Sequence, residues 1–186
     1  MNLVILAETI HRNISIHGSC YYSRVNKLNV EFKARIDDID SVRARLRTLS
    51  PKELGTDHQR DIYFEVPSGR LKLREGGIEK SLIFYRRPDS AETRESHVVY
   101  ATVENTAELR AVLAAALPVL GIVEKAREIF YVGETKIHLD RVDGHGAFLE
   151  VEAPNREEAD RFFTFFELKP MALEGRSYSD FARKPA

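Results

Sequence analysis

Residues 29–35, NVEFKAR, alternate apolar and charged side chains over a length that is typical of a β-strand. Successive side chains of a strand point to opposite faces, so Glu31, Lys33 and Arg35 share one face and the apolar residues between them share the other. A single strand of this kind is usually half buried, with its charged face in water. The fold therefore depends on whether other strands repeat the pattern.

Four later segments repeat it: RLKLR (70–74), VEKARE (123–128), KIHLDRV (136–142) and FLEVE (148–152). The first two place bases on one face, and the last two place acids there. If the sheet closes into a barrel with its charged faces inward, the result is a polar tunnel with an apolar outer wall. Carboxylates opposite Lys and Arg suit a metal-bound polyphosphate, because hard cations take oxygen ligands while ammonium and guanidinium groups bind phosphate oxygens.

The pattern of strands and helices expected along the sequence predicts a fold of the α+β class. Strands are expected at 28–36, 61–66, 70–75, 80–87, 97–103, 122–132, 134–142 and 146–152, and helices at about 37–50, 105–118 and 156–168. Short strands joined by tight turns, with helices inserted singly, indicate an antiparallel eight-stranded sheet or closed barrel with its helices packed outside.

Charge and length limit the classes of partner. The chain has 186 residues, with 28 Lys and Arg against 29 Asp and Glu, a formal net charge of −1. It has no general basic field of the kind that attracts DNA or anionic lipid, so we expect no nucleic-acid partner and no membrane association. We expect an unassigned N-terminal arm at residues 1–27, which show no sustained periodicity, and one tunnel domain at residues 28–186.

The N-terminal region and the cysteine content favour a cytoplasmic protein. The single cysteine, Cys20, cannot form an internal disulfide, and no Cys/His spacing resembles a zinc site. The apolar run at residues 3–7 is too short to span a membrane and follows no basic segment.

The motifs NVEFKAR, DIYF, LKLR, KAR, HLDRV, FLEVE and GRSY resemble, in this order, those of the CYTH family of triphosphate tunnel enzymes. The similarity extends over about Leu28 to Ala182, and NVEFKAR approximates the family's opening motif E-x-E-x-K. The resemblance implies an eight-stranded antiparallel tunnel that binds a triphosphate with Mg²⁺ or Mn²⁺. Class IV adenylate cyclases and thiamine triphosphatases belong to this family.

The resemblance also implies the site residues by motif position. The expected metal ligands are Glu31, Asp140, Glu150 and Glu152. The expected substrate-binding bases are Lys33, Lys72, Arg74, Arg86, Lys125, Arg127 and, in the tail, Arg176. The expected catalytic residues are Glu31, Lys33 and Glu152. Asn29 stands where the family has its first acid, which removes one negative ligand, and His58 and His138 are expected to be structural rather than acid/base groups.

Three functions remain open. An adenylate-cyclase-like enzyme would convert ATP to cyclic AMP and pyrophosphate, and overall resemblance places this metal-dependent reaction first. A triphosphatase would hydrolyse a small triphosphate such as thiamine triphosphate or tripolyphosphate. A non-catalytic domain would bind polyphosphate only, and Asn29 keeps this third function open. The expected partner is ATP or another small triphosphate, and a homodimer is left open.

Overall fold

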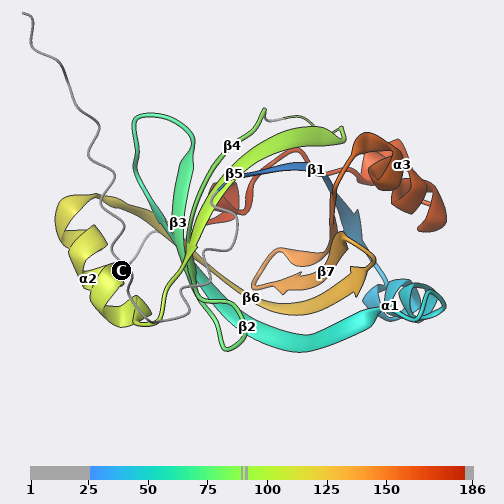
Figure 1. Cartoon of the computed structure of the whole chain (residues 1–186), viewed down its shortest axis with the longest axis horizontal. Helices are drawn as coiled ribbons and strands as arrows, with labels where there is room; N and C mark the ends of the chain where they lie inside the picture. Colours follow the sequence, from blue (N-terminus) through green and yellow to red (C-terminus); the bar gives the residue numbers. More distant parts are fainter. Residues whose placement is uncertain (1–25, 89, 91, 183–186) are drawn as a thin grey trace, which may run out of the picture.

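In the computed structural model, which describes residues 26–88, 90 and 92–182, eight antiparallel strands close into a barrel (Figure 1). The strands are β1 (Asn26–Ile36), β2 (Lys52–Phe64), β3 (Arg70–Glu75), β4 (Ser81–Arg86), β5 (Arg94–Thr102), β6 (Val119–Val132), β7 (Thr135–Val142) and β8 (Gly146–Ala153). Their order around the ring is β1-β5-β4-β3-β2-β6-β7-β8, and β8 pairs back with β1. The predicted α+β fold with an eight-stranded antiparallel barrel is confirmed.

The α-helices of the described residues lie outside the ring, as predicted (Figure 1). They are α1 (Ile39–Arg47), α2 (Thr106–Ala116) and α3 (Arg156–Phe165), followed by the short 3₁₀ helices η1 (Pro170–Ala172) and η2 (Tyr178–Phe181). Each α-helix begins after a residue whose side-chain oxygen accepts a backbone N–H of the first turn: Asp38, Asn105 and Asn155. None of the helices in the described part of the chain is long and apolar enough to cross a membrane.

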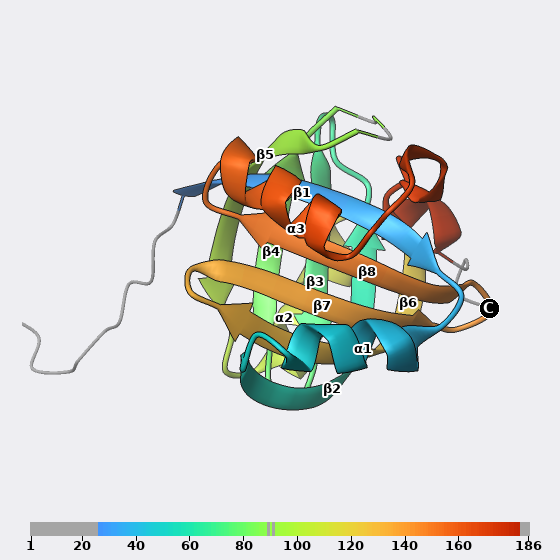
Figure 2. The same ribbon diagram turned by 90° about the vertical axis from the view of Figure 1, so that its right-hand side faces the viewer.

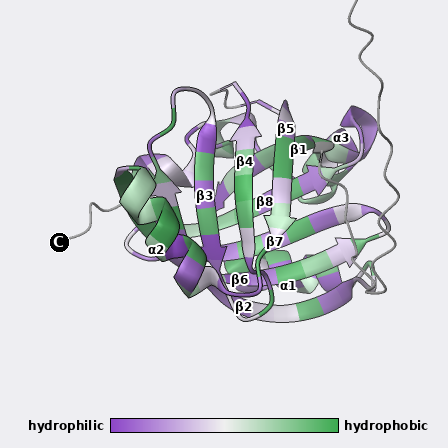
Figure 3. Cartoon of the chain, turned by 60° about the vertical axis from the view of Figure 1, so that its left-hand side comes forward, coloured by the Kyte–Doolittle hydropathy of each residue, from purple (hydrophilic) through white to green (hydrophobic). Residues whose placement is uncertain are grey.

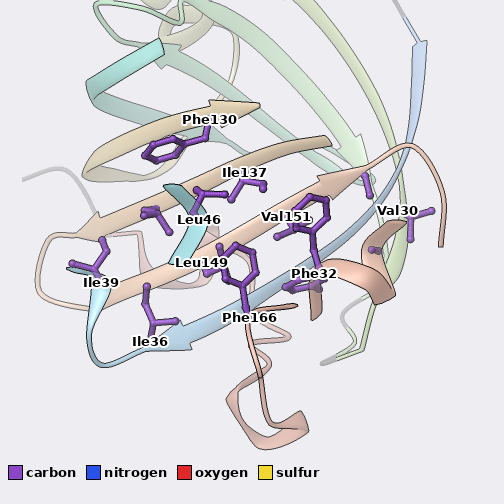
Figure 4. Packing of buried hydrophobic residues seen from close by; sticks show 14 residues of the cluster. Val30, Phe32, Ile36, Ile39, Leu46, Phe130, Ile137, Leu149, Val151 and Phe166 are labelled. Atoms are coloured by element: carbon purple, nitrogen blue, oxygen red, sulfur yellow. The ribbon is translucent and has the colours of Figure 1, made fainter. Parts of the chain in front are cut away.

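The main hydrophobic core lies outside the barrel, between its wall and two helices. Phe32 of β1 and Leu149 of β8 point outward and pack with Leu46 of α1 and Phe166 at the end of α3 (Figures 2 and 4). A smaller cluster packs α2 against β2 and β3. Each such buried side chain contributes about 1.5–3 kcal/mol. The helices therefore stabilise the wall and leave the inside of the ring free for polar groups, so that hydrophobic and hydrophilic residues alternate along the strands (Figure 3).

Several element boundaries differ from the prediction, and the start of β2 differs most. β2 begins at Lys52, whereas the prediction started this strand at Asp61. Outward side chains in the first half of β2 are exposed and inward ones are polar, so neither face gives the apolar periodicity that marks a strand. β1 begins at Asn26, inside the predicted arm. The rest of that arm, residues 1–25, lies outside the described residues.

Candidate functional site

A cavity of about 370 Å³ occupies the inside of the barrel, and all eight strands contribute side chains to it. Among the described residues that line it, seven are Lys or Arg and four are Glu, an excess of three positive charges. Glu31, Lys72, Arg74 and Glu152 all line this one cavity, as the alternating charges of their strands predicted. The charged faces of the strands therefore point inward.

An acidic cluster lies where β1, β8 and β7 are neighbours. Glu31 is opposite Glu152 in the register of β1 and β8, and Glu150 is opposite His138 in the register of β8 and β7. Nδ1 of His138 lies 3.4 Å from Oε2 of Glu150 and 3.9 Å from Oε1 of Glu152. One ligand atom from each of His138, Glu150 and Glu152 lies within 4.8 Å of the others, so these three groups are close enough to hold one metal ion.

Asp140, predicted to bind metal, is instead held by two side chains. The Arg127 guanidinium donates to its carboxylate at 2.7 and 2.5 Å, and the Tyr178 hydroxyl donates at 2.6 Å. Burial raises the pKa of Asp140, but the charge and hydrogen bonds of Arg127, together with the charge of Lys125, outweigh burial and hold this pKa below its usual value. Asp140 is fully buried and is not among the described residues that line the cavity. It orients Arg127, which lines the cavity and also donates to Glu150 at 2.7 Å.

Three of the predicted phosphate-binding bases share one buried carboxylate, that of Asp61. Lys72 donates to it at 2.9 Å, Arg74 at 2.8 and 2.9 Å, and Lys125 at 2.8 Å. Lys72 and Arg74 line the cavity, whereas Lys125 lies fully buried behind them. Burial lowers the pKa of Lys125 to about 7 in spite of the Asp61 charge. Asp61 therefore fixes the positions of two cations at the cavity wall.

A loop between β3 and β4 brings a further acid into the cavity. The Asp57 carboxylate accepts the backbone N–H groups of residues 77–79 at 2.6, 2.9 and 2.9 Å, which holds the loop against β2. Glu79 then reaches inward, where Arg74 donates to it at 2.7 Å and Lys136 donates to its other oxygen. These two cations face the cavity with Glu79 between them. An anionic ligand would compete with Glu79 for both cations.

Arg87 occupies the place that was predicted for Arg86. The side chain of Arg86 is exposed and donates to Ser68 at 2.9 Å, so the prediction that it faces the tunnel is wrong. Arg87 lines the cavity and donates to Glu31, which Arg94 approaches at 3.4 Å. Burial raises the pKa of Glu31 although both guanidinium groups favour its charged form.

Lys33 lies at the end of the cavity that the C-terminal tail covers. Its ammonium donates to the backbone carbonyl of Arg176 and lies 4.2 Å from the centre of the Tyr178 ring. Burial lowers the pKa of Lys33 to about 8. The Arg176 guanidinium is exposed and pairs with Glu174 at 2.7 Å, so this residue meets the site through its backbone rather than its charge.

A family model described as the CYTH domain matches residues 27–183. This chain belongs to the CYTH family. Adenylate cyclase CyaB of Aeromonas hydrophila is 26% identical to it in an alignment of 176 residues that covers 82% of this chain and 87% of that protein.

Solved structures share the CYTH barrel. The PH1012 protein of Pyrococcus horikoshii OT3 superposes with a TM-score of 0.74 at 23% identity, covering 83% of this chain and 99% of that chain. A protein from Hippeastrum, described as having a dominant triphosphatase activity, superposes with a TM-score of 0.55 at 18% identity, covering 82% of this chain and 93% of that one. At these identities the likeness shows the fold alone.

One wall of this CYTH tunnel is uncharged, which the motifs did not indicate. Ile83 of β4 and Val98, Tyr100 and Thr102 of β5 line the cavity there. The charged residues come mostly from the other strands. The cavity therefore combines a strongly charged side with one that suits an uncharged organic group.

Asn29, which replaces the first CYTH motif acid, faces the same cavity beside the acidic cluster. Its amide nitrogen lies 3.4 Å from Oε2 of Glu152, and its Oδ1 is buried without a hydrogen-bond partner among the described residues. The amide therefore offers a neutral oxygen where the family motif has a carboxylate.

Proposed function

We propose that this CYTH protein binds ATP with a divalent cation inside the tunnel and converts it to cyclic AMP and pyrophosphate. The supporting observation is the excess of three positive charges along a cavity that Glu150 and Glu152 also line, and these two residues form a cluster with the buried His138. A triphosphate is highly anionic, and it binds best where cations outnumber acids and a metal ion neutralises part of its charge.

The bases of the wall bind the phosphates in this proposal. Lys72 and Arg74 are fixed by Asp61, and Arg127 is fixed by Asp140, so their donors are oriented before the substrate arrives. The phosphate oxygens displace Glu79 from Arg74. They also accept hydrogen bonds from Lys72 and Arg127, which keep their bonds to Asp61 and Asp140. Preorganised cations of this kind stabilise the charge that develops on the departing pyrophosphate.

Glu150 and Glu152, with His138 beside them, have the donor atoms that a divalent cation requires. Mg²⁺ or Mn²⁺ bound there supplies Lewis-acid stabilisation of the phosphoryl oxygens. Glu31 lies opposite Glu152 and is held by Arg87, and it contributes negative charge to this end of the tunnel.

The ribose 3′-oxygen attacks the α-phosphorus in this reaction, and the bond from that phosphorus to the β-bridging oxygen breaks. Pyrophosphate leaves with the bonding electrons, and the hydroxyl proton passes to a base or to water. The uncharged wall with Ile83, Val98 and Tyr100 accommodates the adenosine, a group that inorganic tripolyphosphate lacks. The relative named adenylate cyclase supports this choice.

Hydrolysis of a small triphosphate is the second candidate. The same charges bind a triphosphate whose terminal phosphorus is attacked by water instead of a ribose oxygen. The Hippeastrum protein, described as having a dominant triphosphatase activity, has the same fold and supports this alternative.

Product identification tests the proposal. The protein is incubated with Mg²⁺ or Mn²⁺ and with ATP, thiamine triphosphate or tripolyphosphate. Cyclic AMP with pyrophosphate supports the cyclase, orthophosphate supports the hydrolase, and binding without turnover supports a non-catalytic domain.

Neighbouring arginines provide a matched control. Arg87→Gln removes a charge from the cavity, and Arg86→Gln removes one from the outer surface of the same region. We expect a loss of turnover in the first variant and none in the second. Equal loss in both variants would contradict the placement of the substrate inside the tunnel.

A further inference from the structure

We propose that His138 is a metal ligand and gives the tunnel a mixed nitrogen and oxygen donor set that prefers Mn²⁺, Co²⁺ or Zn²⁺ to Mg²⁺. The inference deepens the proposed function, because it concerns the cation that accompanies the triphosphate. It is tested without nucleotide, so its outcome does not depend on turnover.

The geometry around the imidazole suits a shared ion better than a direct hydrogen bond. The distances from Nδ1 of His138 to the Glu150 and Glu152 oxygens are 3.4 and 3.9 Å. A good N–H···O bond is about 2.7–3.2 Å long. Ligands that bind one ion at about 2.0–2.2 Å stand roughly 3 Å apart when they are adjacent, so small movements bring all three atoms into coordination distance.

An unpartnered polar group points to a missing ligand at this place. The ring of His138 is fully buried. Oδ1 of Asn29 is also buried and unpartnered in the described part of the chain, and the amide of the same residue lies against Glu152. Burying a polar atom without a partner costs about 1–3 kcal/mol. An ion beside Glu152 would offer the Asn29 oxygen a partner that the described residues do not provide.

The electrostatics favour a cation at the same point. With the imidazole proton on Nε2, Nδ1 and two carboxylate oxygens are all acceptors, and they lie within 4.8 Å of one another. Arg127 donates to Oε2 of Glu150, the oxygen that lies 3.4 Å from Nδ1 of His138, so a cation there would share this oxygen with Arg127. A cation between the three acceptors satisfies each of them at once.

The donor set determines which cation is preferred. Mg²⁺ requires oxygen ligands and gives up its water reluctantly, so the loss of a carboxylate at Asn29 weakens its binding. Imidazole binds first-row transition ions well, and affinity at such sites generally rises from Mn²⁺ through Co²⁺. His138 therefore compensates for Asn29 in the case of transition ions but not in the case of Mg²⁺.

Metal titration of the full chain tests the proposal. Binding of Mg²⁺, Mn²⁺ and Co²⁺ is measured by calorimetry, and pulsed EPR of bound Mn²⁺ detects ¹⁴N coupling from a coordinated imidazole. We expect Co²⁺ to bind at least about tenfold more tightly than Mg²⁺. His138→Gln should lose about tenfold or more in Co²⁺ affinity together with the ¹⁴N signal, and it should change Mg²⁺ affinity little.

His58→Gln is the matched control, because His58 is exposed on β2 and should leave all three affinities unchanged. His138→Asp, which replaces nitrogen by oxygen, should shift the preference toward Mg²⁺ and provides a second readout if the Gln variant unfolds. Wild-type protein that binds no metal, binds it without ¹⁴N coupling, or binds Co²⁺ no better than His138→Gln does would overturn the proposal. Binding through nitrogen without turnover would refute the proposed reaction and leave this inference standing.

Discussion

Replacing Asp61 by Asn should destabilise the protein strongly. The Asp61 carboxylate is fully buried and accepts hydrogen bonds from three cations, Lys72, Arg74 and Lys125. Asn has the same shape but no charge, so three buried cations lose their common counter-charge. Removing one partner of a buried ion pair costs about 3–5 kcal/mol, out of a total free energy of unfolding of about 5–15 kcal/mol.

Urea unfolding at neutral pH measures this change. With an m-value of about 2 kcal/mol per molar urea, the midpoint should fall by about 2 M. The cations hold the pKa of Asp61 well below its usual range, although burial alone would raise it. Its contribution is therefore fully present above the unfolded pKa of about 3.9 and is lost as the pH falls, so the difference between the two proteins should shrink in acid.

Tripolyphosphate provides a further test of the same variant. The cations that Asp61 no longer neutralises should attract the anion, so Asp61→Asn should gain more stability from added tripolyphosphate than the wild type does. Asp160→Asn, an exposed change on α3, is the control. A loss below about 1 kcal/mol in Asp61→Asn, or an equal response of both proteins to the anion, would refute this reasoning.

Three other changes test separate parts of the site. Asp57→Ala removes the acceptor of three backbone N–H groups and should lower the free energy of unfolding by about 1–3 kcal/mol. Hydrogen exchange at the amide of Glu79 should accelerate, and unchanged exchange would contradict the role of Asp57 in holding the loop. Asn29→Glu places a second carboxylate beside Glu152, so it should lower stability without metal and raise Mg²⁺ affinity in calorimetry, and equal affinity would remove Asn29 from the metal site. Burial lowers the pKa of Lys33 to about 8, so affinity for tripolyphosphate should fall as the pH rises through about 8, and Lys33→Met should flatten that profile.

The sequence allowed the tunnel to be predicted because strand periodicity survives inside a barrel. Lys72 and Arg74 alternate with leucines, and Glu150 and Glu152 flank a valine, so these four side chains were assigned to one face of their strands. All four line the cavity. The pairing of bases with buried acids was not predictable, because it depends on the order of the strands around the ring.

The remaining features follow no period of two. Glu79 lies in a loop, where side-chain direction depends on the hydrogen bonds between Asp57 and the loop backbone rather than on alternation. Arg86 and Arg87 are consecutive, so a register error of one residue exchanges the inner and the outer base. The surroundings of His138 were not predictable either, because a single histidine on a strand does not reveal that Glu150 lies opposite it and that Glu152 is close by.

Closure of the ring by β1 has a consequence for folding during synthesis. β1 leaves the ribosome before the other strands, yet Asn29 and its neighbour Glu152 are separated by 123 residues in the chain. Contacts of such long range make folding slow, and until β8 has been made the growing sheet exposes two open edges to other chains. Charged side chains on an unpaired strand oppose pairing between molecules. We therefore expect the alternating Glu31 and Lys33 to reduce aggregation of the nascent polypeptide.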